Sequence, residues 1–139
     1  MTYIVSGYFI NGFTEGHKEM LKSVKSKMTE NDKIIVIVNN EIQQKQKYIS
    51  ATRHLWQIYE LIEPVLNEIF GGNWRVEKSI DRDRTVRETL KYIKNFYEEP
   101  YCFINDGDVT NKCPEEEING IEFAYLGNPK ISSSGEEKK

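Results

Sequence analysis

The sequence predicts one doubly wound α/β domain with a parallel sheet of about five strands. Apolar strand-like runs alternate with amphipathic helical stretches along a chain of 139 residues, a length that allows one domain with its own core. Residues 33–39 form a continuous, largely β-branched run, which is typical of a parallel strand buried on both faces. A strand, a helix and a second such strand make a right-handed βαβ unit. Ligands of such sheets bind at the carboxyl ends of the strands.

The first βαβ unit occupies the amino-terminal forty residues. A short apolar strand at residues 3–5 leads into a glycine-bearing loop, and we expect a helix to begin near Gly16 or His17. Asn and Asp at residues 31–32 end this helix. Its buried face is traced by apolar residues at helical spacing, namely Met20, Leu21, Val24 and Met28.

A longer helix and a third strand follow. Ser50 is expected to cap a helix, whose apolar face is formed by Leu55, Ile58, Tyr59, Ile62, Leu66 and Ile69. Pro64 interrupts this pattern, so it either kinks the helix or opens a second one. The Gly-Gly-Asn turn at residues 71–73 then leads into a short strand at residues 74–80.

The last third of the chain repeats the alternation. Asp83 is expected to cap a helix that carries Val86, Leu90 and Ile93 on one face. The remaining predicted elements are a fourth strand at residues 101–105, a short helix at 114–118 and a fifth strand at 121–126.

Composition excludes several classes of protein. A net charge of −3 argues against a general nucleic-acid-binding surface. No apolar run is long enough to span a bilayer, and the amino terminus lacks the pattern of a signal peptide. Two cysteines are too few for a disulfide framework. We therefore expect a cytoplasmic protein with reduced thiols, and we assign no side chain as a metal ligand.

The loop after the first strand has the features of a phosphate site. Gly7 and Gly12 permit backbone conformations and close approaches that other residues prevent. The start of the following helix offers unpaired N–H groups and a partial positive charge. Thr14 adds a hydroxyl, and His17 adds a ring N–H or a positive charge. Phosphate chemistry is therefore the first functional hypothesis.

Two short motifs in this region resemble the signature of the nucleotidylyltransferase superfamily. They are Gly7-Tyr8-Phe9 and the tetrapeptide Thr14-Glu15-Gly16-His17, which fits a (His/Thr)-x-Gly-His pattern. The superfamily includes adenylyltransferases and small cytidylyltransferases such as the glycerol-3-phosphate cytidylyltransferases. The resemblance implies a Rossmann-like fold and a nucleotide site formed by Gly7, Tyr8, Phe9, Thr14, Gly16 and His17. It further implies that Thr14 and His17 are catalytic and bind the α- and β-phosphates.

Two lysines follow the second predicted strand, in a stretch that we expect to be a loop. Lys45 and Lys47 are either ordinary solvated side chains or groups that neutralise phosphate charge during transfer. The Gln-Lys-Gln-Lys sequence at residues 44–47 resembles that of the glycerol-3-phosphate cytidylyltransferases, which implies catalytic contacts for both lysines and an acceptor contact for Lys45. Arg53 matches a site arginine of the family, although a surface salt bridge is an equal alternative.

Three later residues are candidates for the acceptor and the nucleotide. The segment at residues 79–86 resembles part of a cytidylyltransferase-like subgroup, which implies that Arg82 or Arg84 reaches the acceptor phosphate. The alternative is a capped helix start with solvated arginines. Asp108 resembles a family acidic residue near the nucleotide, where it would bind ribose or base or help to hold Mg²⁺. A simple Asp-Gly turn is the alternative.

The carboxyl-terminal stretch resembles the phosphate-binding element of the same family. The matching residues are Lys130, Ile131, Ser132, Ser133 and Ser134. We therefore divide the chain into a nucleotidylyltransferase domain at residues 1–131 and a phosphate-binding element with a polar tail at residues 132–139. Composition alone would favour a plain polar tail.

Taken with these motifs, the resemblance implies an enzyme that transfers CMP from CTP to a small phosphomonoester, with Mg²⁺ as cofactor. The expected assembly is a homodimer with neither nucleic-acid nor membrane partners. Thr14 in place of the first motif His occurs in phosphopantetheine adenylyltransferases, so an ATP-dependent adenylyltransferase acting on a sugar phosphate or cofactor precursor stays an alternative. Residues 127–129 are Gly-Asn-Pro where the family often has an arginine, which favours a third hypothesis, a non-catalytic nucleotide-binding module.

Overall fold

The computed structural model describes residues 1–49, 52–96, 100–105 and 114–126. Their centre is a five-stranded, all-parallel sheet with the order β3-β2-β1-β4-β5. The predicted α/β fold and the number of strands are confirmed. The strands are β1 (Thr2–Gly7), β2 (Lys33–Val38), β3 (Trp74–Lys78), β4 (Tyr101–Asn105) and β5 (Glu122–Tyr125).

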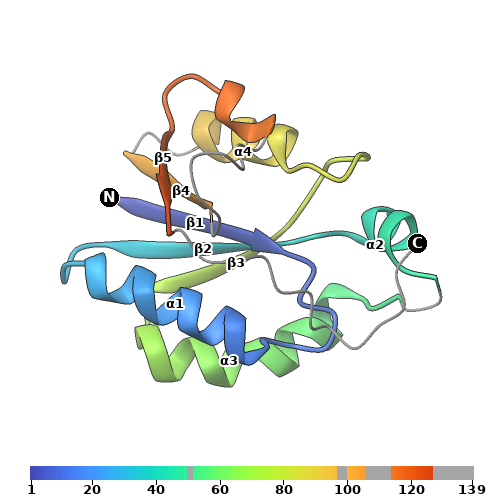
Figure 1. The fold of residues 1–139 in the computed structure, drawn as a ribbon, viewed down its shortest axis with the longest axis horizontal. Coiled ribbons are helices and arrows are strands. Elements are labelled where there is room, and N and C mark those ends of the chain that lie inside the picture. Colours follow the sequence, from blue (N-terminus) through green and yellow to red (C-terminus); the bar gives the residue numbers. More distant parts are fainter. Residues whose placement is uncertain (50–51, 97–99, 106–113, 127–139) are drawn as a thin grey trace.

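Helices cover both faces of the sheet (Figure 1). One layer contains α1 (Glu15–Lys27) and α3 (Leu55–Phe70), and the other contains α4 (Arg87–Phe96) and the 3-10 helix η1 (Pro114–Glu117). Strand β2 feeds both cores, because Val36 packs in the cluster of α1 and α3 whereas Ile35 and Ile37 pack with α4. This two-sided burial explains the unbroken apolar run of β2. None of the helices in the described ranges has the length and apolarity that a membrane span requires.

The topology places the loop after β1 at the switch point of the sheet. Strand β1 pairs with β2 on one side and with β4 on the other. The chain leaves β1 through α1 on one face and reaches β4 through α4 on the opposite face. Ligand sites in open α/β sheets lie at such a reversal, outside the carboxyl ends of the strands. The predicted phosphate loop therefore lies where ligands of open α/β sheets usually bind.

The stretch after β2 is a helix, so the prediction of a lysine-bearing loop is wrong. Helix α2 (Glu41–Lys47) lies beyond the carboxyl ends of β1 and β2 (Figure 1). Its amino terminus is a capping box in which the Asn40 side chain accepts from the backbone N–H of Gln43 and the Gln43 side chain accepts from that of Asn40, both at 3.0 Å. This reciprocal pairing starts a helix without apolar periodicity.

Two other helix boundaries also differ from the predictions. Helix α3 begins at Leu55 rather than next to Ser50, a residue outside the described ranges, and it runs as one helix through Pro64. Helix α1 begins at Glu15 and ends at Lys27, slightly earlier at both ends than expected. Arg53 consequently precedes α3.

Helix α4 is capped by Asp81, not by Asp83 as predicted. The buried Asp81 carboxylate accepts from the backbone N–H groups of Glu88 and Thr89 at 2.8 and 3.0 Å, and from the Thr89 hydroxyl at 2.6 Å. Asp83 instead accepts from the N–H and hydroxyl of Thr85 and so builds a local turn.

Candidate active site

The amino terminus of α1 is organised by Thr14 and His17. The Thr14 hydroxyl oxygen accepts from the backbone N–H of His17 at 3.2 Å, and His17 Nδ1 accepts from the backbone N–H of Thr14 at 3.1 Å. This is a capping box in which an imidazole takes the place usually held by Glu or Gln. The two motif residues that the sequence singled out are therefore joined to each other.

This pairing fixes the chemistry of the imidazole. Because Nδ1 accepts a hydrogen bond, the neutral ring of His17 carries its proton on Nε2. Thr14 uses its oxygen as an acceptor and keeps its O–H as a donor. The N–H groups of the first turn of α1 and the positive end of the helix dipole lie at the same place. Donors thus gather where an anion binds most favourably.

The Phe9 ring packs against His17 and accounts for the presence of glycine at residue 7. The Phe9 ring is buried and meets the His17 ring edge to face, with centroids 4.9 Å apart. A Cβ atom at Gly7 would lie 2.6 Å from the Phe9 ring. The absence of a side chain at Gly7 therefore makes room for the Phe9 ring. A positive φ occurs at Gly12 and Phe9, but not at Gly7.

Helix α2 brings one of the two predicted lysines to the loop after β1. Lys47 Nζ lies 4.4 Å from the centroid of the Tyr8 ring and 5.4 Å from that of Tyr48, and the two rings meet at 5.5 Å. Lys45 is exposed in the same turn of helix. Residues two apart on an α-helix point in nearly opposite directions. The structure therefore brings together Lys47 and Tyr8 and leaves Lys45 on the surface.

A row of amides on α2 holds the loop of residues 81–85. Asn40 Nδ2 donates to the Asp81 carbonyl at 2.8 Å, Gln46 Nε2 to that of Arg82 at 2.5 Å, and Gln43 Nε2 to those of Asp83 and Thr85 at 2.6 and 2.8 Å. Residues spaced three apart share one face of a helix. One side of α2 therefore fixes the backbone on which both candidate arginines lie.

Gln43 is the centre of this network and is fully buried. Its Oε1 accepts from Asn39 Nδ2 and from the backbone N–H of Asn40, both at 3.0 Å, and from the Ser79 hydroxyl. Sequence reasoning missed these residues. The signal that would have found them is Asn or Gln at every third position of the 40–46 stretch, directly after a buried strand.

The next residue, Gln44, makes a similar connection to the Arg53 segment. Gln44 Oε1 accepts from the backbone N–H of Arg53 at 2.6 Å, and Gln44 Nε2 donates to its carbonyl at 2.9 Å. Two neighbouring glutamines thus attach two separate chain segments to α2. The Arg53 side chain is half-buried and donates to the Thr52 carbonyl at 3.4 Å.

Of the two candidate acceptor arginines, Arg84 approaches the loop after β1. Burial raises the pKa of the Tyr8 phenol, and the Arg84 guanidinium lies close enough to lower it in part. The Tyr8 hydroxyl is buried, and no partner among the described residues meets normal hydrogen-bond geometry. We therefore treat the contact between Arg84 and Tyr8 as electrostatic. The described contact of Arg82 is through its carbonyl, with Gln46.

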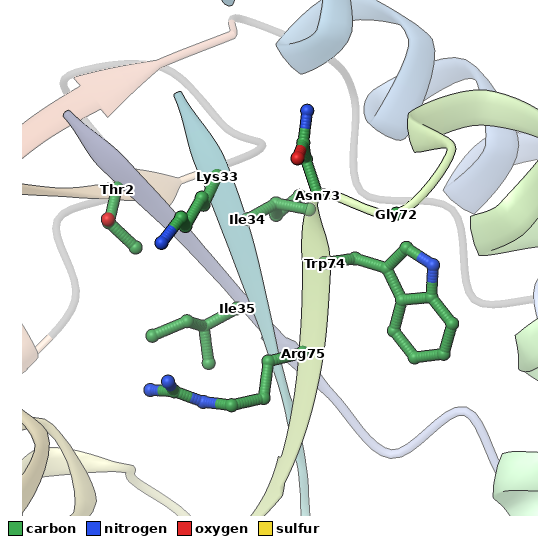
Figure 2. A pocket seen from close by; sticks show the side chains of 8 residues that line it. All are labelled: Thr2, Lys33, Ile34, Ile35, Gly72, Asn73, Trp74 and Arg75. Atoms are coloured by element: carbon green, nitrogen blue, oxygen red, sulfur yellow. The ribbon is translucent and has the colours of Figure 1, made fainter. Parts of the chain in front are cut away.

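A separate pocket of about 370 Å³ lies at the other end of the sheet. It is lined by the first residues of β1, β2 and β3 and by the turn before β3, namely Thr2, Lys33, Ile34, Ile35, Gly72, Asn73, Trp74 and Arg75. Figure 2 shows the Arg75 and Trp74 side chains leaving β3 in opposite directions. Arg75 pairs with Glu77 at 2.9 Å. This pocket lies at the amino ends of the strands and is distinct from the site at His17.

The remaining predicted site residues lie outside the described ranges. They are Asp108, Lys130, Ile131, Ser132, Ser133 and Ser134. Gly16, by contrast, belongs to the first turn of α1 beside Thr14 and His17.

The fold and this site define the chain as a Rossmann-like α/β protein with a donor-rich helix start at the switch point of its sheet. No protein-family model matches the sequence, and no curated protein matches it. In structure, the chain is similar to a Plasmodium falciparum nicotinic acid mononucleotide adenylyltransferase complexed with NaAD. That likeness has a TM-score of 0.54 at 14% identity and covers 94% of this chain and 76% of the other. It supports the fold.

Proposed function

We propose that this protein is a nucleotidylyltransferase. The observation that carries the proposal is the Thr14–His17 capping box, which holds both motif side chains at the start of α1, at the switch point of the sheet. The structural neighbour has a similar fold and is a nicotinic acid mononucleotide adenylyltransferase complexed with NaAD. Fold likeness and local chemistry therefore point to the same kind of reaction.

The proposed reaction needs no covalent enzyme intermediate. A phosphate oxygen of the acceptor attacks the α-phosphorus of a nucleoside triphosphate, the bond from that phosphorus to the β-bridging oxygen breaks, and pyrophosphate leaves. Charge builds on the α-phosphate oxygens in the transition state. His17 Nε2–H and the Thr14 hydroxyl would donate to these and to the β-phosphate oxygens. Gly16 adds a backbone N–H in the same turn.

The cationic side of the site would bind the acceptor. Lys47 lies beside Tyr8 and His17 lies beside Phe9, so the lysine and the histidine contact consecutive residues of the same loop. Lys45 is exposed, and its proposed role is at the rim of the site. There its ammonium would approach the ligand only after the ligand has bound. Arg53, Asp108 and the Lys130 to Ser134 element stay proposals that rest on the resemblance.

We further propose that Mg²⁺ enters the site with the triphosphate. The described residues contain no group of three or more His, Cys, Asp or Glu side chains that could hold a metal. Mg²⁺ in nucleotide enzymes is commonly held by substrate phosphates and water with one or two carboxylates. When bound, the ion would offset polyphosphate charge. The homodimer and the cytoplasmic location likewise remain predictions.

CTP is the proposed donor and a small phosphomonoester, such as a phospho-alcohol, the proposed acceptor. ATP is the alternative donor, favoured by Thr14 in the motif and by the adenylyltransferase neighbour. A nucleotide-binding module without turnover is the second alternative. Pyrophosphate release with CTP or ATP, measured over a panel of phosphomonoesters, separates all three. Release with one nucleotide names the donor, whereas calorimetric binding without release under every acceptor would favour the module.

The role of His17 has a direct kinetic test. A lost transition-state contact of this kind costs on the order of 3 kcal/mol, so His17→Ala should lower kcat at least about a hundredfold with the fold intact by circular dichroism. His54→Ala is the matched control, because the other histidine of the chain is exposed and lies outside the proposed site. Near-normal turnover of His17→Ala would refute the assignment.

A further inference from the structure

The loop of residues 81–85 is held more firmly than its exposure suggests. Asp83 and Arg84 are exposed, yet Gln43 Nε2 donates to the carbonyls on both sides of Arg84, at 2.6 and 2.8 Å. Gln43 cannot rotate away, because its Oε1 accepts from Asn39, Asn40 and Ser79 at the same time. The backbone at Arg84 is therefore fixed from the interior of the protein.

The loop that carries Arg84 is attached to the helix that carries Lys47, so both cations lie on the elements beside Tyr8. Lys47 Nζ lies over the Tyr8 ring at 4.4 Å, and the Arg84 guanidinium acts on the phenol oxygen of the same residue. Lys47 follows Gln43 by four residues, so it lies on the side of α2 that holds the loop. The two cations thus come from different elements that meet at α2, and both act on Tyr8, Lys47 at the ring and Arg84 through the pKa of the phenol.

We propose that Arg84 selects the acceptor by binding its phosphate dianion, and that Gln43 is the residue that positions Arg84. The inference rests on the proposed nucleotidylyl transfer and adds the residue that decides acceptor affinity. A guanidinium suits a phosphate because its planar N–H groups match two oxygens at once. A dianion also relieves the repulsion between Arg84 and Lys47, which favours a phosphate over a singly charged or neutral acceptor.

The kinetic test compares two arginines of the same loop. Arg84→Ala should raise the KM for the acceptor at least tenfold and change the KM for the nucleotide less than twofold. Arg82→Ala is the matched control and should leave both values within twofold, because the described contact of Arg82 is through its backbone. Equal effects of the two substitutions, or a rise in the nucleotide KM alone, would overturn the inference.

Gln43→Glu tests the positioning role. The substitution keeps a side-chain oxygen for Asn39, Asn40 and Ser79 but replaces the Nε2 donors to the loop. The acceptor KM should rise, and Arg84→Ala added to this background should raise it less than threefold further, because residues that act through one another are not additive. Independent, multiplicative effects would overturn the positioning role. Circular dichroism establishes that each variant is folded.

A structural readout separates this inference from the proposed function. In protein with ¹³C-labelled tyrosine, Arg84→Ala should raise the pKa of Tyr8 above its value in the unmodified chain, with Lys47 and Tyr48 still facing the ring, while Arg82→Ala should not. A Tyr8 titration equal in both variants would contradict the placement of Arg84 even in an active enzyme. No pyrophosphate release from the unmodified chain would overturn the proposed function and with it the selecting role, whatever the Tyr8 result.

Discussion

At the scale of single residues, the site depends on residues that form hydrogen bonds with one another in the protein without ligand. His17 and Thr14 cap helix α1 by accepting from each other's backbone N–H groups. The sequence predicted this pair because its residue types and spacing follow a strand and precede a helix. For Gly7 the sequence suggested backbone freedom, whereas the structure shows that the missing side chain makes room for the Phe9 ring two residues later.

Gly7→Ala tests this packing. A methyl group 2.6 Å from the buried Phe9 ring must displace that ring, so we expect a loss of about 1–3 kcal/mol in the free energy of unfolding. Turnover should fall as well, because Phe9 contacts His17. Gly72→Ala is the control, since nothing lies within 4 Å of its Cβ position and its φ is not positive. Urea unfolding of both variants gives the comparison, and equal stabilities would contradict the steric role of Gly7.

At the scale of elements, the strands were predictable and the polar connections were not. Apolar and β-branched runs identified β2 and β4, whose side chains are buried almost throughout. Helix α2 escaped prediction because it is short and polar and its start depends on the Asn40–Gln43 box. The burial of Asp81 beneath α4 depends on tertiary packing. From local sequence alone, Asp81 and Asp83 have the same capping potential.

The cap of α4 gives a stability prediction. Asp81→Ala removes an acceptor from two backbone N–H groups and a hydroxyl in a buried place. Loss of a cap together with unsatisfied donors should lower the free energy of unfolding by about 2 kcal/mol. Asp83→Ala, at an exposed turn, should cost about 0.5 kcal/mol. Thermal or urea unfolding measures both, and a larger loss for Asp83→Ala would reverse the assignment of the cap.

At the scale of the whole molecule, the order of the strands determines where chemistry can occur. With β1 central and the crossovers reversing between β1 and β4, the loop after β1 and helix α2 meet at one edge of the sheet. The pocket at the amino ends of β1, β2 and β3 lies at the opposite edge. The parallel pairing and the location of the site at the carboxyl ends of the strands were predictable from the sequence. The attachment of residues 81–85 to α2 was visible only in the folded structure.

The central claim is that the imidazole of His17, held with its proton on Nε2, meets the phosphates of a nucleoside triphosphate. The chain has two histidines, so ¹⁵N-detected NMR of both rings during a titration with CTP or ATP and Mg²⁺ tests it directly. We predict an Nε2–H tautomer for His17 at pH 8 and a saturable shift of its ring resonances, with His54 unchanged. An Nδ1–H tautomer, or His17 resonances that stay constant while the nucleotide binds, would contradict the claim.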